Sequence, residues 1–175
     1  MSQRDSGYER KVLDRYETPA WVTEALLPHL PRVPEVVWEP ACGTGRMVAV
    51  LEAHDIVVHA TDIETGRDFL ADDYAVGSDA IITNPPYHQA YAFILRALDL
   101  MDETDGIVAM LLRTDFDHAK TRQGLFSACP VFFKKVVLTR RIKWFEDSKG
   151  SPSFNHAWFI WDWQHEGAPT LAYGP

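Results

Sequence analysis

Cysteine is scarce in this chain, and the usual cysteine clusters are missing. Only Cys42 and Cys129 occur among 175 residues, neither lies in a CxxC pair, and the seven histidines are scattered. A disulfide framework and a structural zinc site are therefore not expected, and we predict no bound metal.

Long apolar runs are absent as well. No stretch approaches the ~18 consecutive apolar residues that mark a membrane span. Residues 1–5 are polar and lack the apolar core of a secretion signal. We therefore predict a cytoplasmic protein that does not bind a membrane.

Positive charge is in short supply: 17 lysines and arginines face 25 aspartates and glutamates, which leaves a net charge of −8. This balance argues against strong nonspecific binding of nucleic acid by the whole surface. The cations are unevenly spread, however, and residues 134–149 form a basic window that contains Lys134, Lys135, Arg140, Arg141, Lys143 and Lys149. The window is either a solvated face or a local patch for phosphate groups.

Two common nucleotide-binding motifs are missing from the turn Glu39-Pro40-Ala41-Cys42-Gly43-Thr44-Gly45. No Walker lysine follows, and residues 46–48 do not complete a GxGxxG pattern. Phosphoryl transfer and a nicotinamide cofactor are thus disfavoured, although the glycines still allow the backbone to approach a ligand closely. We interpret this turn as a ligand-binding loop.

Apolar runs alternate with helix-like segments along most of the chain. Strands are predicted at residues 35–38, 56–60, 79–83, 106–112, 136–139 and 157–163, with residues 69–70 as a short strand or a turn. Helices are predicted from Thr18, as N-cap, and Pro19 toward Pro31, and at residues 46–53, 91–101 and 118–128. This alternation favours an α/β fold with a parallel sheet covered on both faces. We expect residues 16–175 to form a single domain after a charged N-terminal arm at residues 1–15.

Acidic residues follow the second predicted strand, where such sheets bind their ligands. Asp62 lies about twenty residues after the glycine turn and is either a ligand for ribose hydroxyls or a helix cap. Asp68 and Phe69 either receive an adenine amino group and stack on its ring, or are a turn residue and a core aromatic.

Asn84-Pro85-Pro86-Tyr87, directly after the apolar strand at residues 79–83, is the most informative stretch. An exocyclic amine on a base has its lone pair delocalised into the ring. The Asn84 side-chain oxygen and the Pro85 carbonyl would accept its two hydrogens and free that lone pair, while Pro85 and Pro86 keep the loop stiff. Tyr87 offers a stacking face. We predict that these four residues are catalytic.

At these residues the chain resembles the class I S-adenosylmethionine-dependent methyltransferases, and especially the N-P-P-Y amino-methyltransferases that modify the N6 amine of adenine in DNA. The matching stretches lie within residues 16–112, and their order, with Tyr16-Glu17-Thr18-Pro19 first and the catalytic tetrapeptide last, resembles the gamma arrangement. Residues 112–116 and 151–158 are similar to stretches of small phage and prophage methyltransferases. The resemblance implies a Rossmann-like, doubly wound, mostly parallel seven-stranded sheet with an antiparallel last strand.

The resemblance also implies S-adenosylmethionine as the cofactor and suggests which residues contact it. The stretch Tyr16-Glu17-Thr18-Pro19, which matches the family's T-P element, would close over the methionine end of the cofactor, and Ile63 would contact its adenine ring. The expected cofactor-binding residues are Thr18, Pro19, Glu39, Ala41, Gly43, Gly45, Asp62, Ile63, Asp68 and Phe69.

The second wall of the acceptor site is expected near residues 151–156, where Phe145 or Phe154 would stack on the far side of the base. The expected substrate-binding residues are Tyr87, Arg140, Arg141, Lys143 and Phe154. The aromatic residues at 158–163 are instead typical of a core strand.

The family usually carries a large target-recognition domain, whereas only residues 88–175 follow Tyr87 here. We therefore expect sequence specificity to come from short loops, a protein partner or self-association, or else to be weak. The predicted function is N6 methylation of adenine, with nucleic acid, preferably DNA, as the partner. The alternatives are methylation of an RNA base amine or a protein glutamine amide by the same fold, and a non-catalytic module that only binds the donor.

Overall fold

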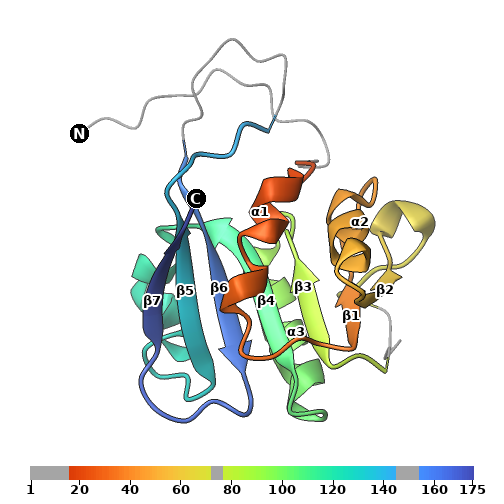
Figure 1. The fold of residues 1–175 in the computed structure, drawn as a ribbon. Coiled ribbons are helices and arrows are strands. Elements are labelled where there is room, and N and C mark those ends of the chain that lie inside the picture. The colour runs from red at the N-terminus through yellow and green to blue at the C-terminus, as the bar shows by residue number, and fades with distance from the viewer. Residues whose placement is uncertain (1–15, 72–76, 145–153) are drawn as a thin grey trace.

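The computed structural model describes residues 16–71, 77–144 and 154–175 (Figure 1). The predicted arm at residues 1–15 lies outside the described residues, as do Phe145, Lys149 and residues 151–153.

Strands from these ranges form one seven-stranded sheet in the order β2-β1-β3-β4-β6-β5-β7. The strands are β1 (Val36–Glu39), β2 (Val57–Ala60), β3 (Ala80–Thr83), β4 (Ile107–Arg113), β5 (Phe132–Leu138), β6 (His156–Asp162) and β7 (Thr170–Gly174). The α-helices are α1 (Ala20–Glu24), α2 (Arg46–Ala53) and α3 (Ala90–Asp102). Short 3-10 helices are η1 (Leu27–His29), η2 (Ile63–Thr65), η3 (Phe116–His118) and η4 (Lys120–Leu125).

The strand directions confirm the predicted fold class. Strands β1 to β4 run parallel, and β6 is inserted antiparallel between β4 and β5. Strand β6 corresponds to the strand predicted at residues 157–163. The remaining strand, β7, pairs in parallel with β5.

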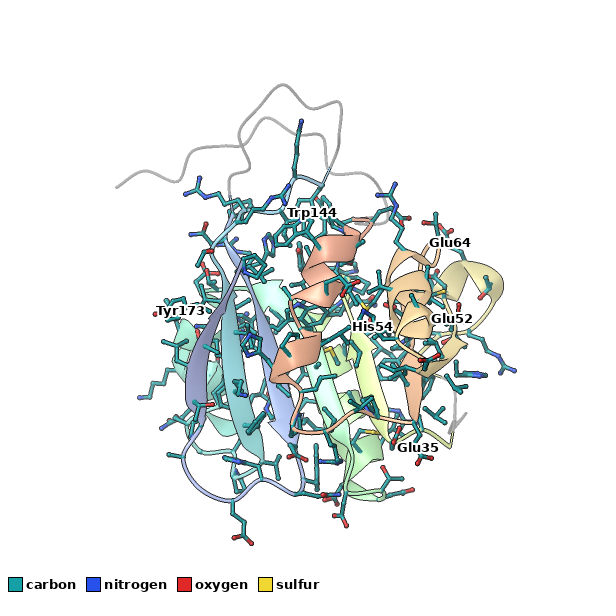
Figure 2. All side chains as sticks on the ribbon, viewed as in Figure 1. Glu35, Glu52, His54, Glu64, Trp144 and Tyr173 are labelled. Carbon is teal, nitrogen blue, oxygen red and sulfur yellow. The ribbon has the colours of Figure 1, made fainter. Side chains whose placement is uncertain are left out.

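The seventh strand is β7 rather than residues 69–70. At Asp68 the carboxylate accepts a hydrogen bond from Leu70 N at 3.0 Å and the carbonyl accepts one from Ala71 N at 3.1 Å. These bonds close a turn, which was the second interpretation of this stretch. The sequence did not reveal β7 because its large apolar side chains, Leu171 and Tyr173, are exposed, whereas the residues that pack inward, Ala172 and Gly174, are small. Tyr173 is labelled on this strand in Figure 2.

Strand β4 shows how both faces of the sheet are covered. Its odd-numbered residues from Ile107 to Leu111 pack with side chains of α1 and α2, and its even-numbered residues from Val108 to Leu112 pack with side chains of α3. Figure 1 shows α1 and α2 in front of the sheet and α3 behind it. Because successive strand residues face opposite ways, a strand between two helical layers must be apolar throughout.

Two predicted helices differ from the structure. The first ends at Glu24 and is followed by η1, because Pro28 has no N–H to donate to the carbonyl four residues earlier, that of Glu24. The helix predicted at residues 118–128 is replaced by η3 and η4. In the ranges that the structure describes, every helix is too short or too polar to cross a lipid bilayer.

Candidate active site

A cavity of about 270 Å³ lies at the carboxyl ends of β1, β2 and β3. Its wall combines residues 16–18, the loop after β1, the turn after β2 and the loop after β3. The structure gathers most of the predicted site residues here: Thr18, Glu39, Ala41, Gly43, Asp62, Ile63, Asp68, Phe69, Asn84, Pro85 and Pro86. Pro19, Gly45 and Tyr87 adjoin lining residues in the chain but do not line the cavity themselves.

The loop after β1 turns at its two glycines. Gly43 and Gly45 have φ angles of 52° and 83°, and Gly45 N donates to Cys42 O at 2.8 Å. A Cβ atom on Gly43 would lie 3.3 Å from Glu17 Oε1. Glycine therefore meets two requirements at residue 43, a left-handed backbone and a close neighbour.

Asp62 is a helix cap in this structure, which was one of its two interpretations. Its Oδ1 accepts from Glu64 N at 2.9 Å and its Oδ2 accepts from Gly43 N at 2.9 Å. The carboxylate thus joins η2 to the glycine loop. Each oxygen carries a second lone pair, which leaves acceptor capacity for a ligand.

Phe69 belongs to the core and also borders the cavity. Its ring packs edge-on against Trp38, with centroids 5.1 Å apart, and tilts against Phe93 at 4.9 Å. Since Phe69 is 4% exposed, only a small part of the ring is open to a ligand.

Glu39 is a buried carboxylate with one unused oxygen. Oε1 accepts from Thr83 Oγ1 at 3.3 Å, whereas buried Oε2 has no hydrogen-bond partner among the described residues. Burial, and next the negative charges of Asp62 and Glu17, raise the pKa of Glu39 well above its usual value. A cationic ligand in the cavity would stabilise the charged form of Glu39 and provide a partner for Oε2.

Residues 16–18, here called the bridging segment, tie the two sides of the cavity together. On the side of the loop after β1, Glu17 Oε2 accepts a hydrogen bond from Thr44 Oγ1 and lies 3.9 Å from Arg46 Nε. On the other side, Asn84 Nδ2 donates to Tyr16 O and to Thr18 Oγ1, each at 3.1 Å.

Thr18 is not the helix cap that the sequence predicted. Helix α1 begins after Pro19 without a side-chain cap, and the Thr18 hydroxyl instead accepts from Asn84. The threonine of the T-P element therefore contacts the predicted catalytic residue.

Asn84 has one end fixed and one end unused. The Tyr16 carbonyl can only accept a hydrogen bond, so the amide nitrogen must face it and the side-chain oxygen must face the other way. That oxygen, Oδ1, is buried without a hydrogen-bond partner among the described residues. Buried acceptors are seldom left unpaired, so the atom marks a place for a donor from a ligand.

Aromatic side chains gather around Tyr87. The Tyr87 ring centroid lies 5.7 Å from that of Tyr16, with an interplanar angle of 28°, and 6.4 Å from that of Trp144 at 71°. The Tyr87 hydroxyl is 2.9 Å from His156 Nε2. Trp144 is labelled in Figure 2, above the N-terminal end of α1. The sequence placed Tyr16 and His156 within stretches of the expected site, but it assigned no role to these two rings or to Trp144, because a local pattern gives no sign of which distant rings meet.

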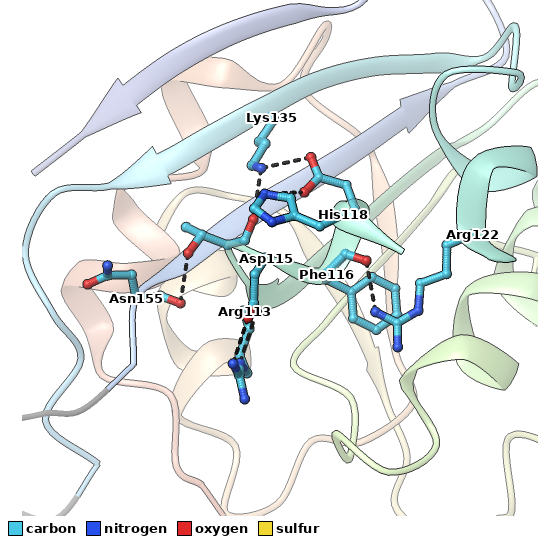
Figure 3. Close-up of polar contacts among 9 residues, drawn as sticks. Arg113, Asp115, Phe116, His118, Arg122, Lys135 and Asn155 are labelled. Atoms are coloured by element: carbon cyan, nitrogen blue, oxygen red, sulfur yellow. Dashed lines mark hydrogen bonds and ion pairs between the residues drawn. The ribbon is translucent and has the colours of Figure 1, made fainter. Parts of the chain in front are cut away.

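The described part of the basic window divides into two groups. Lys134 donates to His29 O at 3.3 Å, and Lys135 donates to Thr114 O at 2.8 Å and to Asp117 Oδ2 at 2.7 Å (Figure 3). These two lysines of β5 are used within the fold. The three cations that follow β5 are exposed: Arg140, Arg141 and Lys143.

The predicted outer substrate residues do not line the cavity. Arg140 lies over the Trp21 ring at 4.8 Å, and Arg141 Nε donates to Asn155 Oδ1 at 2.9 Å. Phe154 is 42% exposed, and the Arg113 guanidinium lies 4.3 Å from its ring centroid. The rings beside Tyr87 are instead those of Tyr16, Trp144 and His156. Phe145 lies outside the described residues.

No protein-family model and no curated protein matches this chain. Solved structures do match it. The M protein of the type I restriction enzyme EcoKI is 13% identical with a TM-score of 0.59, and the match covers 92% of this chain and 49% of that one. A Listeria monocytogenes protein assigned as a class I S-adenosylmethionine-dependent methyltransferase is 15% identical with a TM-score of 0.51, covering 87% and 61%.

A third structure is the 1,6-didemethyltoxoflavin-N1-methyltransferase of Burkholderia thailandensis, with bound S-adenosylhomocysteine. It is 14% identical with a TM-score of 0.54, and the match covers 83% of this chain and 78% of that one. The chain spans about half the length of the EcoKI M protein and less than two thirds of the Listeria protein. Together these structures show that the chain has the class I S-adenosylmethionine-dependent methyltransferase fold.

Proposed function

We propose that this protein is an S-adenosylmethionine-dependent methyltransferase that modifies the exocyclic N6 amine of adenine in DNA. The observation that carries the proposal is the Asn84 amide. Its nitrogen is held by Tyr16 and Thr18, and its buried oxygen has no partner among the described residues. A side chain held in this way is ready to accept a hydrogen bond from an amine.

The residues of the cavity suit S-adenosylmethionine. The unpartnered Oε2 of Glu39 matches the ammonium of an amino acid moiety, Asp62 retains acceptor capacity for ribose hydroxyls, and Ile63 is 60% exposed at the cavity wall. Gly43 and Gly45 keep the loop between them close to the ligand. The cofactor, when bound, supplies a methyl group already activated on a sulfonium, so the protein has mainly to orient and to exclude water.

The acceptor side suits an aromatic amine. Asn84 Oδ1 and the Pro85 carbonyl would each accept one hydrogen of the amine, which weakens its conjugation with the ring and exposes the nitrogen lone pair. Tyr16, Tyr87 and Trp144 form an aromatic group next to this position. Such rings favour a planar base, for which stacking contributes roughly 1–3 kcal/mol, over the aliphatic stem of glutamine.

DNA is the preferred carrier of the base. Arg140, Arg141 and Lys143 are exposed on the segment after β5 that leads to Trp144, where phosphate groups flanking an extruded base would pass. The likeness to a restriction-enzyme M protein agrees with this choice.

A transfer assay tests the proposal. The protein is incubated with radiolabelled S-adenosylmethionine and, separately, DNA, RNA and a protein lysate. Label in DNA that digests to an N6-methylated adenine nucleoside is expected. Label only in RNA or protein would support methylation of an RNA base amine or a glutamine amide instead, and donor binding without any transfer would indicate a non-catalytic module.

A further inference from the structure

His156 lies next to Tyr87 and has no part in the proposed chemistry so far. It is the first residue of β6, paired with Arg113 at the end of β4, and it is 1% exposed. Its Nε2 is 2.9 Å from the Tyr87 hydroxyl, and the two rings are nearly parallel, with centroids 5.9 Å apart and an interplanar angle of 23°. Strand β6 is thus linked, through His156, to the hydroxyl of Tyr87 in the loop after β3.

Trp144 supports the same pair from another side. Its ring meets His156 edge-on at 5.2 Å and 86°, and meets Tyr87 at 6.4 Å and 71°. A tyrosine has two rotatable side-chain bonds, so a bond at its hydroxyl together with packing on its ring leaves one orientation.

The imidazole of His156 makes its hydrogen bond to the Tyr87 hydroxyl, through Nε2. The other ring nitrogen, Nδ1, is buried without a partner among the described residues. Burial, and next the Arg113 charge, lower the pKa of His156 to about 4, so the imidazole is neutral at physiological pH. A neutral imidazole has one N–H and one acceptor nitrogen, which suits a single bond to a hydroxyl.

We propose that His156 is a positioning residue that acts through Tyr87: it fixes the plane on which the acceptor base stacks and so places the amine against Asn84. The inference rests on the proposed function, because it needs a planar acceptor on Tyr87. His156 does not touch the reacting atoms. A tilt of the Tyr87 ring would shift the base stacked on it and move the amine nitrogen away from the methyl group. The rate of methyl transfer is sensitive to such a displacement.

A double-mutant cycle tests this role. His156→Asn places its amide near the position of Nδ1 and cannot reach Tyr87, whereas His156→Gln places its amide near Nε2. Tyr87→Phe keeps the ring and removes the hydroxyl. Each variant and the double variant His156→Asn/Tyr87→Phe is assayed with S-adenosylmethionine and a single-stranded oligodeoxynucleotide containing one adenine, and donor affinity is measured by calorimetry.

We expect His156→Asn and Tyr87→Phe each to lower kcat/KM for the oligonucleotide roughly threefold to tenfold, the net effect of one neutral hydrogen bond. The double variant should be no slower than the slower single variant, and His156→Gln should restore part of the loss. Donor affinity should stay the same in all variants that fold. Since Tyr87→Phe removes a single atom, an unchanged kcat/KM in that variant overturns the inference even where His156→Asn does not fold.

The outcomes separate this inference from the proposed function. A wild-type protein that transfers no methyl group to the oligonucleotide overturns both. An active wild type whose two substitutions act additively, or whose His156→Asn variant weakens donor binding as much as it lowers transfer, overturns only the role of His156.

Discussion

At the scale of single residues, Asn84 is set apart by an amide whose two ends have different surroundings. Replacing it with alanine removes the unpaired Oδ1 together with the two hydrogen bonds from Nδ2 to the bridging segment. We expect Asn84→Ala to lower kcat about 100-fold or more, as the loss of a preorganised polar group at a reacting centre does elsewhere. The variant should still bind the donor, as measured by calorimetry.

Gln123 offers a control for Asn84. Its side chain is exposed in η4, and it does not line the cavity. Gln123→Ala should keep kcat within about twofold of the wild type, by the small effect usual for surface substitutions. Equal turnover in Asn84→Ala and wild type would contradict the role given to Asn84.

Asp62 has two tasks that a pair of substitutions can separate. Asp62→Ala removes the carboxylate proposed to hold ribose, and it also removes the cap of η2. Thr65→Ala removes the Thr65 hydroxyl that bonds Asp62 N and Asp62 O, but it keeps the carboxylate. We expect donor affinity to fall roughly tenfold in Asp62→Ala, the effect of one hydrogen bond to a charged group, and little in Thr65→Ala. Equal losses by calorimetry would assign Asp62 to the cap alone.

At the scale of the elements, the two halves of the basic window make different predictions. Arg140 and Arg141 are exposed after β5, although Arg141 also bonds Asn155. The lysines of β5 are half-buried and bond to His29, Thr114 and Asp117. Arg140→Gln/Arg141→Gln should therefore reduce the slope of log affinity for DNA against log salt by about 1.8 for a duplex, if both contact phosphate. Binding is measured by fluorescence anisotropy at several salt concentrations.

The exposed Lys120 in η4 provides the control for that slope. Lys120→Gln changes one surface charge away from the segment after β5 and should leave the slope as in the wild type. A slope that falls equally in both proteins would show that net charge, rather than this segment, governs binding.

The sequence predicted the elements with strong local patterns and missed those without one. β4 and β6 are apolar runs buried on both faces, and both were found. In β7 the large apolar side chains are exposed and the inward residues are small, and Asp68 closes a turn where a strand was one option. The Asn84–Thr18 and Tyr87–His156 contacts join residues 66 and 69 positions apart, which a local pattern cannot pair.

At the scale of the whole molecule, His156 makes global stability depend on pH. Its pKa falls from 6.5 in the unfolded chain to about 4 in the folded protein, so its contribution is complete above pH 6.5 and is lost as pH falls through about 4. The full loss is about 3 kcal/mol. Urea unfolding at pH 7, 5.5 and 4 should therefore show the wild type losing its advantage over His156→Gln as pH falls.

Glu39 is expected to change stability with pH in the opposite direction to His156, so it provides a control for the effect of His156. Its raised pKa gives stability that is present at low pH and lost as pH rises through the folded value. Relative to the wild type, the free energy of unfolding of Glu39→Gln should therefore increase as pH increases, whereas that of His156→Gln should increase as pH decreases. A constant difference between wild type and His156→Gln at all three pH values would contradict the assigned pKa.

We expect the bridging segment to couple the binding of donor and acceptor. Its three residues contact the glycine loop through Glu17 and the proposed catalytic residue Asn84 through Tyr16 and Thr18. If binding of the donor orders residues 16–18, the acceptor then binds without the entropy cost of ordering them, and the same holds in reverse. Linkage then requires each ligand to strengthen the other by the same factor, so an affinity for either one has meaning only when the concentration of its companion is stated.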